Sequence, residues 1–196
     1  MSSVESIRAH AQRLFAAQGY AATSIAQIAR ASGVSKAAVF HHYPSKRDLY
    51  LAVIESAHRE LAGDLEDLPV AADECGRLRM LMAVHLEYLL RNADVTRLVV
   101  RELLNGNLGT DERTVLGAAL NRNYQRVAGA LEPAEGDVSV DGVKDTAFLM
   151  LAANLAYVLL APCLDDLQGS PGANRVAFVQ RMSRAMYAGA AAKVAP

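Results

Sequence analysis

Residues 23–46 read TSIAQIARASGVSKAAVFHHYPSK, and this stretch decides the fold. Its spacing predicts two short helices joined by a tight turn. Ser24 and Gln27 have the spacing of a capping box, which begins the first helix. Gly33 is expected to end that helix, because glycine readily takes the left-handed conformation of a sharp turn. Ser35 is the expected N-cap of the second helix, which closes before the next proline.

The second helix divides into two faces. Val39 points toward the first helix, whereas Lys36, Ala37, Phe40 and His41 share the opposite face at about 3.6 residues per turn. A cation, a small residue, an aromatic ring and an imidazole suit the major groove of DNA and its phosphates. The pattern therefore predicts a helix-turn-helix with this second helix as the recognition helix. The alternative is an ordinary helical hairpin in a protein core.

The charges are unevenly distributed along the 196 residues, although the net charge is only −1. Residues 1–60 hold seven Lys or Arg against four acidic residues, and the remainder holds thirteen against seventeen. A basic N-terminal part on an acidic body fits a protein that presents one end to a polyanion.

Hydrophobic periodicity predicts an all-α protein of nine helices and two domains. Residues 1–48 form a three-helix DNA-binding head that contains the helix-turn-helix, and residues 49–196 form a helical effector-binding and dimerisation body. A helix over residues 45–64 links the two. The other expected helices span residues 3–18, 24–30, 35–42, 73–92, 94–105, 110–131, 141–167 and 173–193, with turns or loops at 106–107, 133–139 and 169–172.

Residues 147–164 carry no charge and approach the length of a membrane-spanning helix. Asn154 and Pro162 interrupt this run, so we expect a core or interface helix in place of a membrane span. The last two helices have more apolar surface than one small core covers, which predicts a homodimer through a four-helix bundle. The charged N-terminus is not a signal peptide, and Cys75 and Cys163 are expected as buried free thiols of a cytoplasmic protein.

The motif of residues 23–46 resembles the N-terminal domain of the TetR family of transcriptional regulators. The resemblance covers about residues 5–60, because the turn, the recognition helix and the start of the next helix arrive in register. It implies a homodimeric DNA-binding regulator, usually a repressor, that binds a palindromic operator in double-stranded DNA and is released by a small-molecule effector. The family commonly has Tyr where this chain has Phe40, so a phenolic phosphate contact is lost there.

The resemblance also implies which residues contact DNA. Phosphate contacts are expected from Thr23 or Ser24 and from Lys46, and Ala37 is placed to touch a thymine methyl group. The full set is Thr23, Ser24, Ser35, Lys36, Ala37, Phe40, His41, His42 and Lys46. The histidine pair is not a metal site, because adjacent residues on a helix point about 100° apart.

The effector site is expected where polar side chains interrupt the apolar faces of the body. The candidates are His85, Tyr88, Arg101, Glu102, Asn105, Tyr124, Asn154 and Tyr157, with Tyr124 and Asn154 foremost. Few of them are cationic, so a neutral or moderately apolar ligand is expected. For each residue, a structural role in the core or in an ion-pair network is the alternative.

An enzyme and an architectural or protein-interaction protein are the two other classes of function. The sequence contains no phosphate-binding glycine loop, no HExxH motif and no nucleophile elbow, so we expect neither an enzyme nor a cofactor. An architectural or protein-interaction DNA-binding protein without an effector stays open as the alternative.

Overall fold

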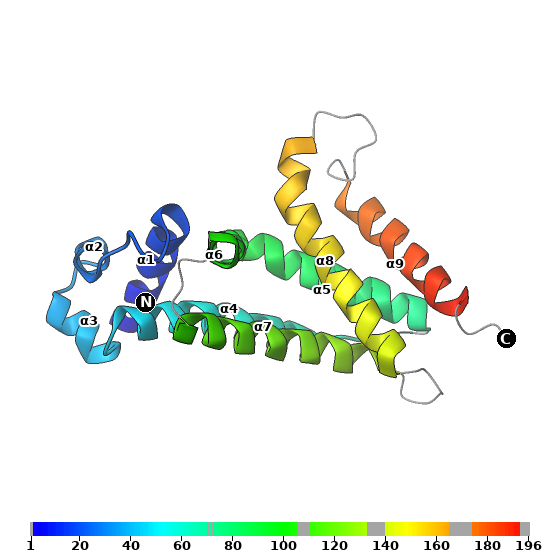
Figure 1. Cartoon of the computed structure of the whole chain (residues 1–196), viewed down its shortest axis with the longest axis horizontal. Coiled ribbons are helices and arrows are strands. Elements are labelled where there is room, and N and C mark those ends of the chain that lie inside the picture. Colours follow the sequence, from blue (N-terminus) through cyan, green and yellow to red (C-terminus); the bar gives the residue numbers. More distant parts are fainter. Residues whose placement is uncertain are drawn as a thin grey trace. The chain divides into compact units, whose positions relative to one another are not determined.

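The computed structural model describes residues 2–69, 71, 73–105, 110–132, 140–164 and 174–192. Within these ranges the chain is helical throughout and has no strand, which confirms the predicted all-α fold (Figure 1). Its nine helices are α1 (Ser3–Gln18), α2 (Ile25–Ala31), α3 (Lys36–His42), α4 (Lys46–Glu66), α5 (Glu74–Arg91), α6 (Ala93–Asn105), α7 (Thr110–Leu131), α8 (Val140–Leu164) and α9 (Arg175–Ala192). The turns expected at 106–107, 133–139 and 169–172 lie outside the described residues.

The chain groups into two compact units. The first unit comprises Met1–Arg59 and Asn92–Leu120, and the second comprises Glu60–Arg91 and Asn121–Pro196. Helices α4 and α7 therefore each begin in the first unit and end in the second. Helix α6 packs against α1, a grouping that the sequence did not predict. The predicted boundary after residue 48 separates a DNA-binding part from an effector-binding part. This division of functions stays a prediction.

Aromatic side chains form the centre of the first unit. The rings of Phe15 and Tyr20 each meet the ring of Tyr50 edge-on, at centroid distances of 5.4 and 4.9 Å. Phe15 and Tyr50 are fully buried, together with Ile28 of α2 and Leu49 of α4. Edge-on pairs add to the free energy gained by burial, so this cluster joins α1 to the start of α4.

The second unit is built around α5, which packs against α8 and α9. Leu78, Leu81, Met82 and Leu86 are buried at about helical spacing along α5. Figure 1 shows α8 crossing α5, with α9 beside them. These three helices form the core of the second unit.

Helix α8 has a buried face and an exposed apolar face. Ala147, Met150 and Asn154 are buried, whereas Phe148 and Leu149 are 65% and 53% exposed, and Leu160, further along, is exposed as well. By length and composition alone, Gly142–Leu160 could cross a membrane, but a single helix of this kind is weak evidence and core helices pass the same test. The exposed apolar side chains lie on the side of α8 opposite its buried residues.

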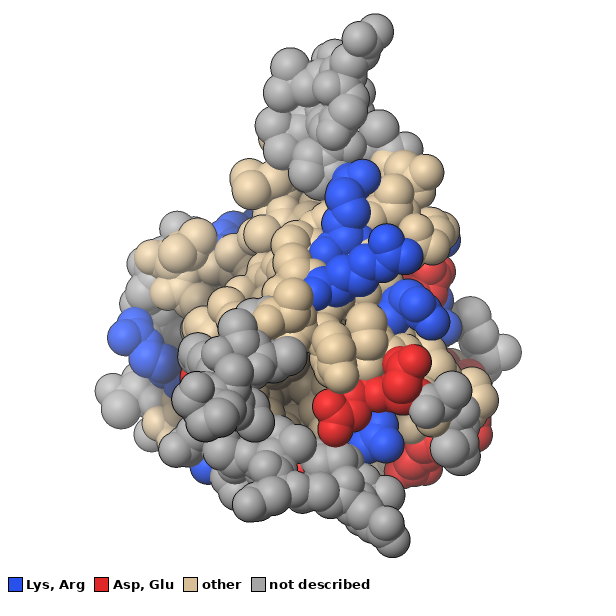
Figure 2. Space-filling model, turned by 90° about the vertical axis from the view of Figure 1, so that its right-hand side faces the viewer, with Lys and Arg blue, Asp and Glu red and all other residues tan. Residues whose placement is uncertain are grey.

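The two cysteines are free, as expected. Cys75 is half-buried and Cys163 is exposed, so the predicted burial is wrong for Cys163. It lies in the last turn of α8. On the face drawn in Figure 2, basic side chains gather in one area and acidic ones lie close to it, so that face carries both signs of charge.

Candidate nucleic-acid interface and effector site

The turn of the helix-turn-helix has the geometry that the sequence predicts. Gly33 has a φ of 69°, and the Val34 amide donates to the carbonyl of Ala29 at 3.0 Å, which closes the end of α2. A Cβ atom at Gly33 would meet nothing within 4 Å, so the backbone conformation alone is what favours glycine here. The turn fixes the direction in which α3 leaves.

Helix α3 presents a continuous exposed face. The Ser35 hydroxyl caps it by accepting from the Ala38 amide at 3.1 Å, and Val39 is fully buried. On the other side, the side chains of Lys36, Ala37, Phe40, His41 and His42 are all exposed. Because Phe40 is 46% exposed, an aromatic ring is held in water on this face. An exposed apolar ring beside a cation suits contact with a nucleic-acid groove.

The histidine pair lies at the end of this face. The two rings stand 5.2 Å apart, and Nε2 of His42 lies 3.3 Å from the hydroxyl of Ser3. Among the described residues, no three His, Cys, Asp or Glu side chains come together in a way that would hold a metal ion. His42 therefore connects the recognition helix to the first turn of α1.

Thr23 does not lie on the exposed surface. It is 1% exposed, and its hydroxyl donates to the carbonyls of Gly19 at 2.8 Å and Leu14 at 3.2 Å. In this conformation the Thr23 hydroxyl is buried and occupied by two carbonyls, so a phosphate contact from Thr23 stays a prediction. Ser24 is exposed and forms the predicted capping box with Gln27. Of the two alternatives, only Ser24 is accessible.

Lys46 has partners that the sequence did not predict. Its ammonium donates to the carbonyls of Tyr20 at 2.9 Å and Thr23 at 3.1 Å, with a longer contact to Ala21, and it lies 4.4 Å from the centre of the Tyr20 ring. The hydrogen-bond donors and the charge of this ammonium are therefore largely occupied by the carbonyl dipoles and the aromatic face. Lys46 thus ties the loop after α1 to the start of α4, and a phosphate contact from it stays a prediction.

Two of the predicted effector residues meet in the core of the second unit. Asn154 is fully buried, and its Nδ2 donates to the carbonyl of Met82 at 2.9 Å and lies 3.1 Å from Nδ1 of His85. The amide nitrogen is a donor only, so Nδ1 of His85 accepts and the imidazole proton sits on Nε2. The amide oxygen of Asn154 has no hydrogen-bond partner. We refer to His85 and Asn154 as the buried polar pair.

Burial keeps His85 neutral. Desolvation lowers the pKa of its imidazole from 6.5 to about 4. The ring of Tyr88 lies 6.1 Å from that of His85, and burial raises the pKa of the Tyr88 phenol. The buried polar pair therefore presents neutral hydrogen-bonding groups, and an effector contact from it stays a prediction.

The other effector candidates lie elsewhere. Tyr124 donates to the carbonyl of Lys144 at 3.2 Å, at the first part of α8, and Tyr157 stacks on Phe178 at 4.6 Å. Arg101 and Glu102 belong to the first unit, where they contact the end of α1. The side chain of Asn105 is outside the described residues. Sequence spacing could not separate these sites, because it carries no information about which helices pack together.

The structure combines a capped helix-turn-helix, an exposed α3 and a helical body. This arrangement is the fold of helix-turn-helix regulators. Residues 7–53 match the family described as bacterial regulatory proteins, tetR family. The chain therefore carries the N-terminal domain of the TetR family, as its motif indicated. The regulators of this family are not enzymes.

Curated relatives resemble the chain over part of its length. The nucleoid occlusion factor SlmA of Vibrio campbellii is 30% identical over 124 residues, which are 63% of this chain and 61% of that protein. The SlmA of Vibrio cholerae is 27% identical over 128 residues, 65% of this chain and 63% of that protein. The chain thus matches about three fifths of the length of these relatives.

Solved structures share the whole fold. A transcriptional regulator from Rhodococcus sp. RHA1 has a TM-score of 0.71 at 17% identity, over 96% of this chain and 97% of that one. FadR from Bacillus subtilis, in complex with stearoyl-CoA, has a TM-score of 0.67 at 14% identity, over 93% of this chain and 96% of that one. At these identities the similarity establishes the fold alone.

Proposed function

We propose that the chain is a transcriptional repressor that binds a palindromic operator as a homodimer and is released by a small molecule. The exposed face of α3 is the observation that carries this proposal. Lys36 supplies charge to the phosphates, and Ala37 and Phe40 offer apolar contact to base edges. Ser24, Ser35, His41 and His42 flank that face and are exposed. One short recognition helix reads few base pairs, so two copies are needed for a specific site.

The homodimer forms, in this proposal, through the exposed apolar face of α8 together with α9. Phe148, Leu149 and Leu160 are more than half exposed on α8. Covering these side chains removes apolar area from water, which is the main favourable term in association. Two helices from each chain give a closed, symmetric bundle.

The effector, in this proposal, binds at the buried polar pair. A buried amide oxygen without a donor costs about 1–3 kcal/mol, and a ligand hydroxyl or amide would satisfy it. Because burial keeps His85 in its neutral form, the ligand is expected to be neutral. The FadR structure with stearoyl-CoA supports the idea that a chain of this fold holds a small molecule.

Release follows from a shift between two conformations. Helices α4 and α7 are shared by both units, so a ligand that favours one arrangement of the second unit also favours one pose of α4. The pose of α4 sets the spacing of the two recognition helices. Affinity for a palindrome depends on that spacing, so the effector lowers it.

The test begins with footprinting of the chromosomal region around the gene, followed by fluorescence anisotropy on the protected sequence. A discrete palindrome, bound by two chains and weakened in the Lys36→Ala variant, is expected. Binding of one chain, or no preference over scrambled DNA, would contradict the proposal. Adding a metabolite panel to the preformed complex then identifies the effector by the loss of anisotropy.

The similarity to nucleoid occlusion factors favours a second candidate function. In that case the chain binds DNA at many chromosomal sites and acts through a protein partner, without an effector. A genome-wide footprint distinguishes the two. Few sites near promoters favour the repressor, whereas many dispersed sites with unchanged expression of neighbouring genes favour the second candidate.

A further inference from the structure

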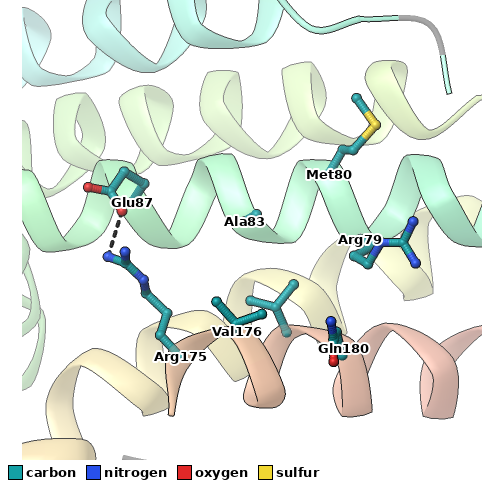
Figure 3. A pocket seen from close by; sticks show the side chains of 8 residues that line it. Arg79, Met80, Ala83, Glu87, Arg175, Val176 and Gln180 are labelled. Carbon is teal, nitrogen blue, oxygen red and sulfur yellow. Dashed lines mark hydrogen bonds and ion pairs between the residues drawn. The ribbon is translucent and has the colours of Figure 1, made fainter.

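A groove of about 400 Å³ runs between α5 and α9 in the second unit (Figure 3). On α5 its lining comes from Arg79, Met80, Ala83 and Glu87, which share one face because they recur at about helical spacing. His85 lies on the other, buried face of this helix. The groove is therefore separate from the buried polar pair.

The middle of the groove is apolar. Met80 and Ala83 of α5 and Val176 and Val179 of α9 line it. Val176 is 62% exposed, so a ligand that covers it removes apolar area from water. Arg79 and Glu87 are eight residues apart on α5, which makes the groove about 12 Å long at 1.5 Å per residue.

The two ends of the groove differ in charge. At one end Arg175 is paired with Glu87 at 2.6 Å (Figure 3). At the other end lies the exposed guanidinium of Arg79, with the amide of Gln180 nearby in the lining, and Arg79 has no ion pair or hydrogen bond within the described residues. An anionic group is attracted to Arg79, whereas the charges of Arg175 and Glu87 offset each other at the opposite end. The groove thus has a preferred direction for a ligand with one negative end.

We propose that this groove binds a small amphipathic monoanion, such as a medium-chain carboxylate, with the carboxylate at Arg79 and the chain along Met80, Ala83 and Val176. Its volume lies within the range of small-molecule pockets. Small-molecule pockets measure about 300–1,000 Å³, whereas a stable protein interface needs about 800 Å² from each partner. The guanidinium can hold a carboxylate through two parallel hydrogen bonds. This site is independent of DNA binding and of the proposed effector.

The test compares probes that differ only in the charge of one end, using isothermal titration calorimetry on the full chain. Octanoate is expected to bind at least about tenfold more tightly than octan-1-ol, because a charge-assisted contact adds to the same apolar burial. The Arg79→Glu variant is expected to reverse the preference, binding octylammonium more tightly than octanoate. Arg122→Glu is the matched control, since Arg122 is an exposed arginine on α7 outside the groove.

Ala83→Phe tests the apolar part of the groove. Ala83 is exposed, so a ring there fills the groove without entering the core. It is expected to abolish the binding of both octanoate and octan-1-ol while the circular dichroism spectrum and the molecular mass stay unchanged. Equal affinity of the wild type for the two probes, or an Arg79→Glu variant that still prefers octanoate, would overturn the proposal. A fall in mass from dimer to monomer in Ala83→Phe would identify the groove as a contact between copies and would overturn it too.

Discussion

The guanidinium of Arg101 on α6 donates a hydrogen bond from Nη2 to the backbone carbonyl of Phe15, at 2.6 Å. Phe15 lies in the last turn of α1, and its carbonyl also accepts from the amide of the C-cap residue Gly19 at 2.8 Å. The neighbouring Glu102 accepts from the Tyr20 amide at 3.1 Å. Adjacent side chains of opposite charge thus hold both sides of the chain reversal at Gly19, where φ is 90°. This contact explains why α6 belongs to the first unit.

Glu102→Ala should lower the free energy of unfolding by about 1–3 kcal/mol, because a carboxylate that is 5% exposed and accepts a hydrogen bond is removed. Urea denaturation followed by circular dichroism measures the change. Asp94→Ala is the control on the same helix, where the exposed pair with Arg97 at 3.8 Å should contribute less than about 1 kcal/mol. Equal losses in the two variants would show that the contact with α1 is not stabilising.

Lys46→Met should lower stability and leave the salt dependence of operator binding nearly unchanged, since the ammonium is held by Tyr20 and Thr23 carbonyls. Lys36→Ala should leave stability nearly unchanged and reduce the salt dependence of operator binding. The slope of log K against log salt should fall by about one for each Lys36 that contacts a phosphate. Fluorescence anisotropy over a range of salt concentrations measures both slopes. A reduced slope in Lys46→Met would instead support the phosphate contact that the family resemblance implies.

Thr23→Val should cost about 1 kcal/mol of stability, because the hydroxyl that donates to Gly19 and Leu14 is lost while the volume is kept. Operator affinity, measured at a temperature where the variant is fully folded, should stay at the wild-type value. Weaker operator binding in the folded variant would mean that Thr23 becomes exposed in the complex.

The helix-turn-helix could be predicted from sequence because its signals are local. Ser24, Gly33 and Ser35 act on residues within four positions, and each has the predicted role in the structure. The partners of Thr23 and Lys46 could not be predicted in the same way. The acceptors of Lys46 lie in the loop after α1, 23 to 26 residues away, and one acceptor of Thr23 is the carbonyl of Leu14 inside α1.

The effector candidates show the same limit. His85 and Asn154 are 69 residues apart, and only the packing of α5 against α8 brings them within 3.1 Å. Arg101 had the same appearance in the sequence, a polar side chain on an apolar helix, yet α6 packs on α1 and gives it a structural role. Periodicity predicts which side of a helix is buried, but the identity of the partner helix depends on tertiary packing.

Leu149→Glu should separate the proposed homodimer. Leu149 is 53% exposed on the apolar face of α8, so a carboxylate there should be tolerated in one chain but placed in an apolar contact in the dimer. Sedimentation equilibrium should show the mass falling from two chains to one, and operator affinity should fall with it. Lys144→Glu, an exposed change near the start of α8, is the control and should keep the wild-type mass. A monomeric wild type would contradict the homodimer.

The buried polar pair should make stability depend on pH. The pKa of His85 is about 4 in the folded chain and 6.5 when the imidazole is exposed, so the unfolded chain binds more protons between these values. The contribution of His85 is therefore complete above about pH 6.5 and is lost progressively as the pH falls toward 4, by about 3 kcal/mol in all. Urea denaturation at a series of pH values should show this decline in the wild type.

His85→Gln should remove that part of the decline, because glutamine does not titrate and its side-chain oxygen can accept from Asn154 Nδ2. His41→Gln, a change on the exposed face of α3, leaves His85 in place and should keep the decline. The carboxylates titrate in both variants. The difference between the two pH dependences of stability therefore gives the contribution of the buried imidazole alone. If His85→Gln lost stability between pH 6.5 and 4 as steeply as His41→Gln, the imidazole would be charged or hydrated in the folded chain. A neutral ligand at the pair would then no longer be favoured over an anionic one.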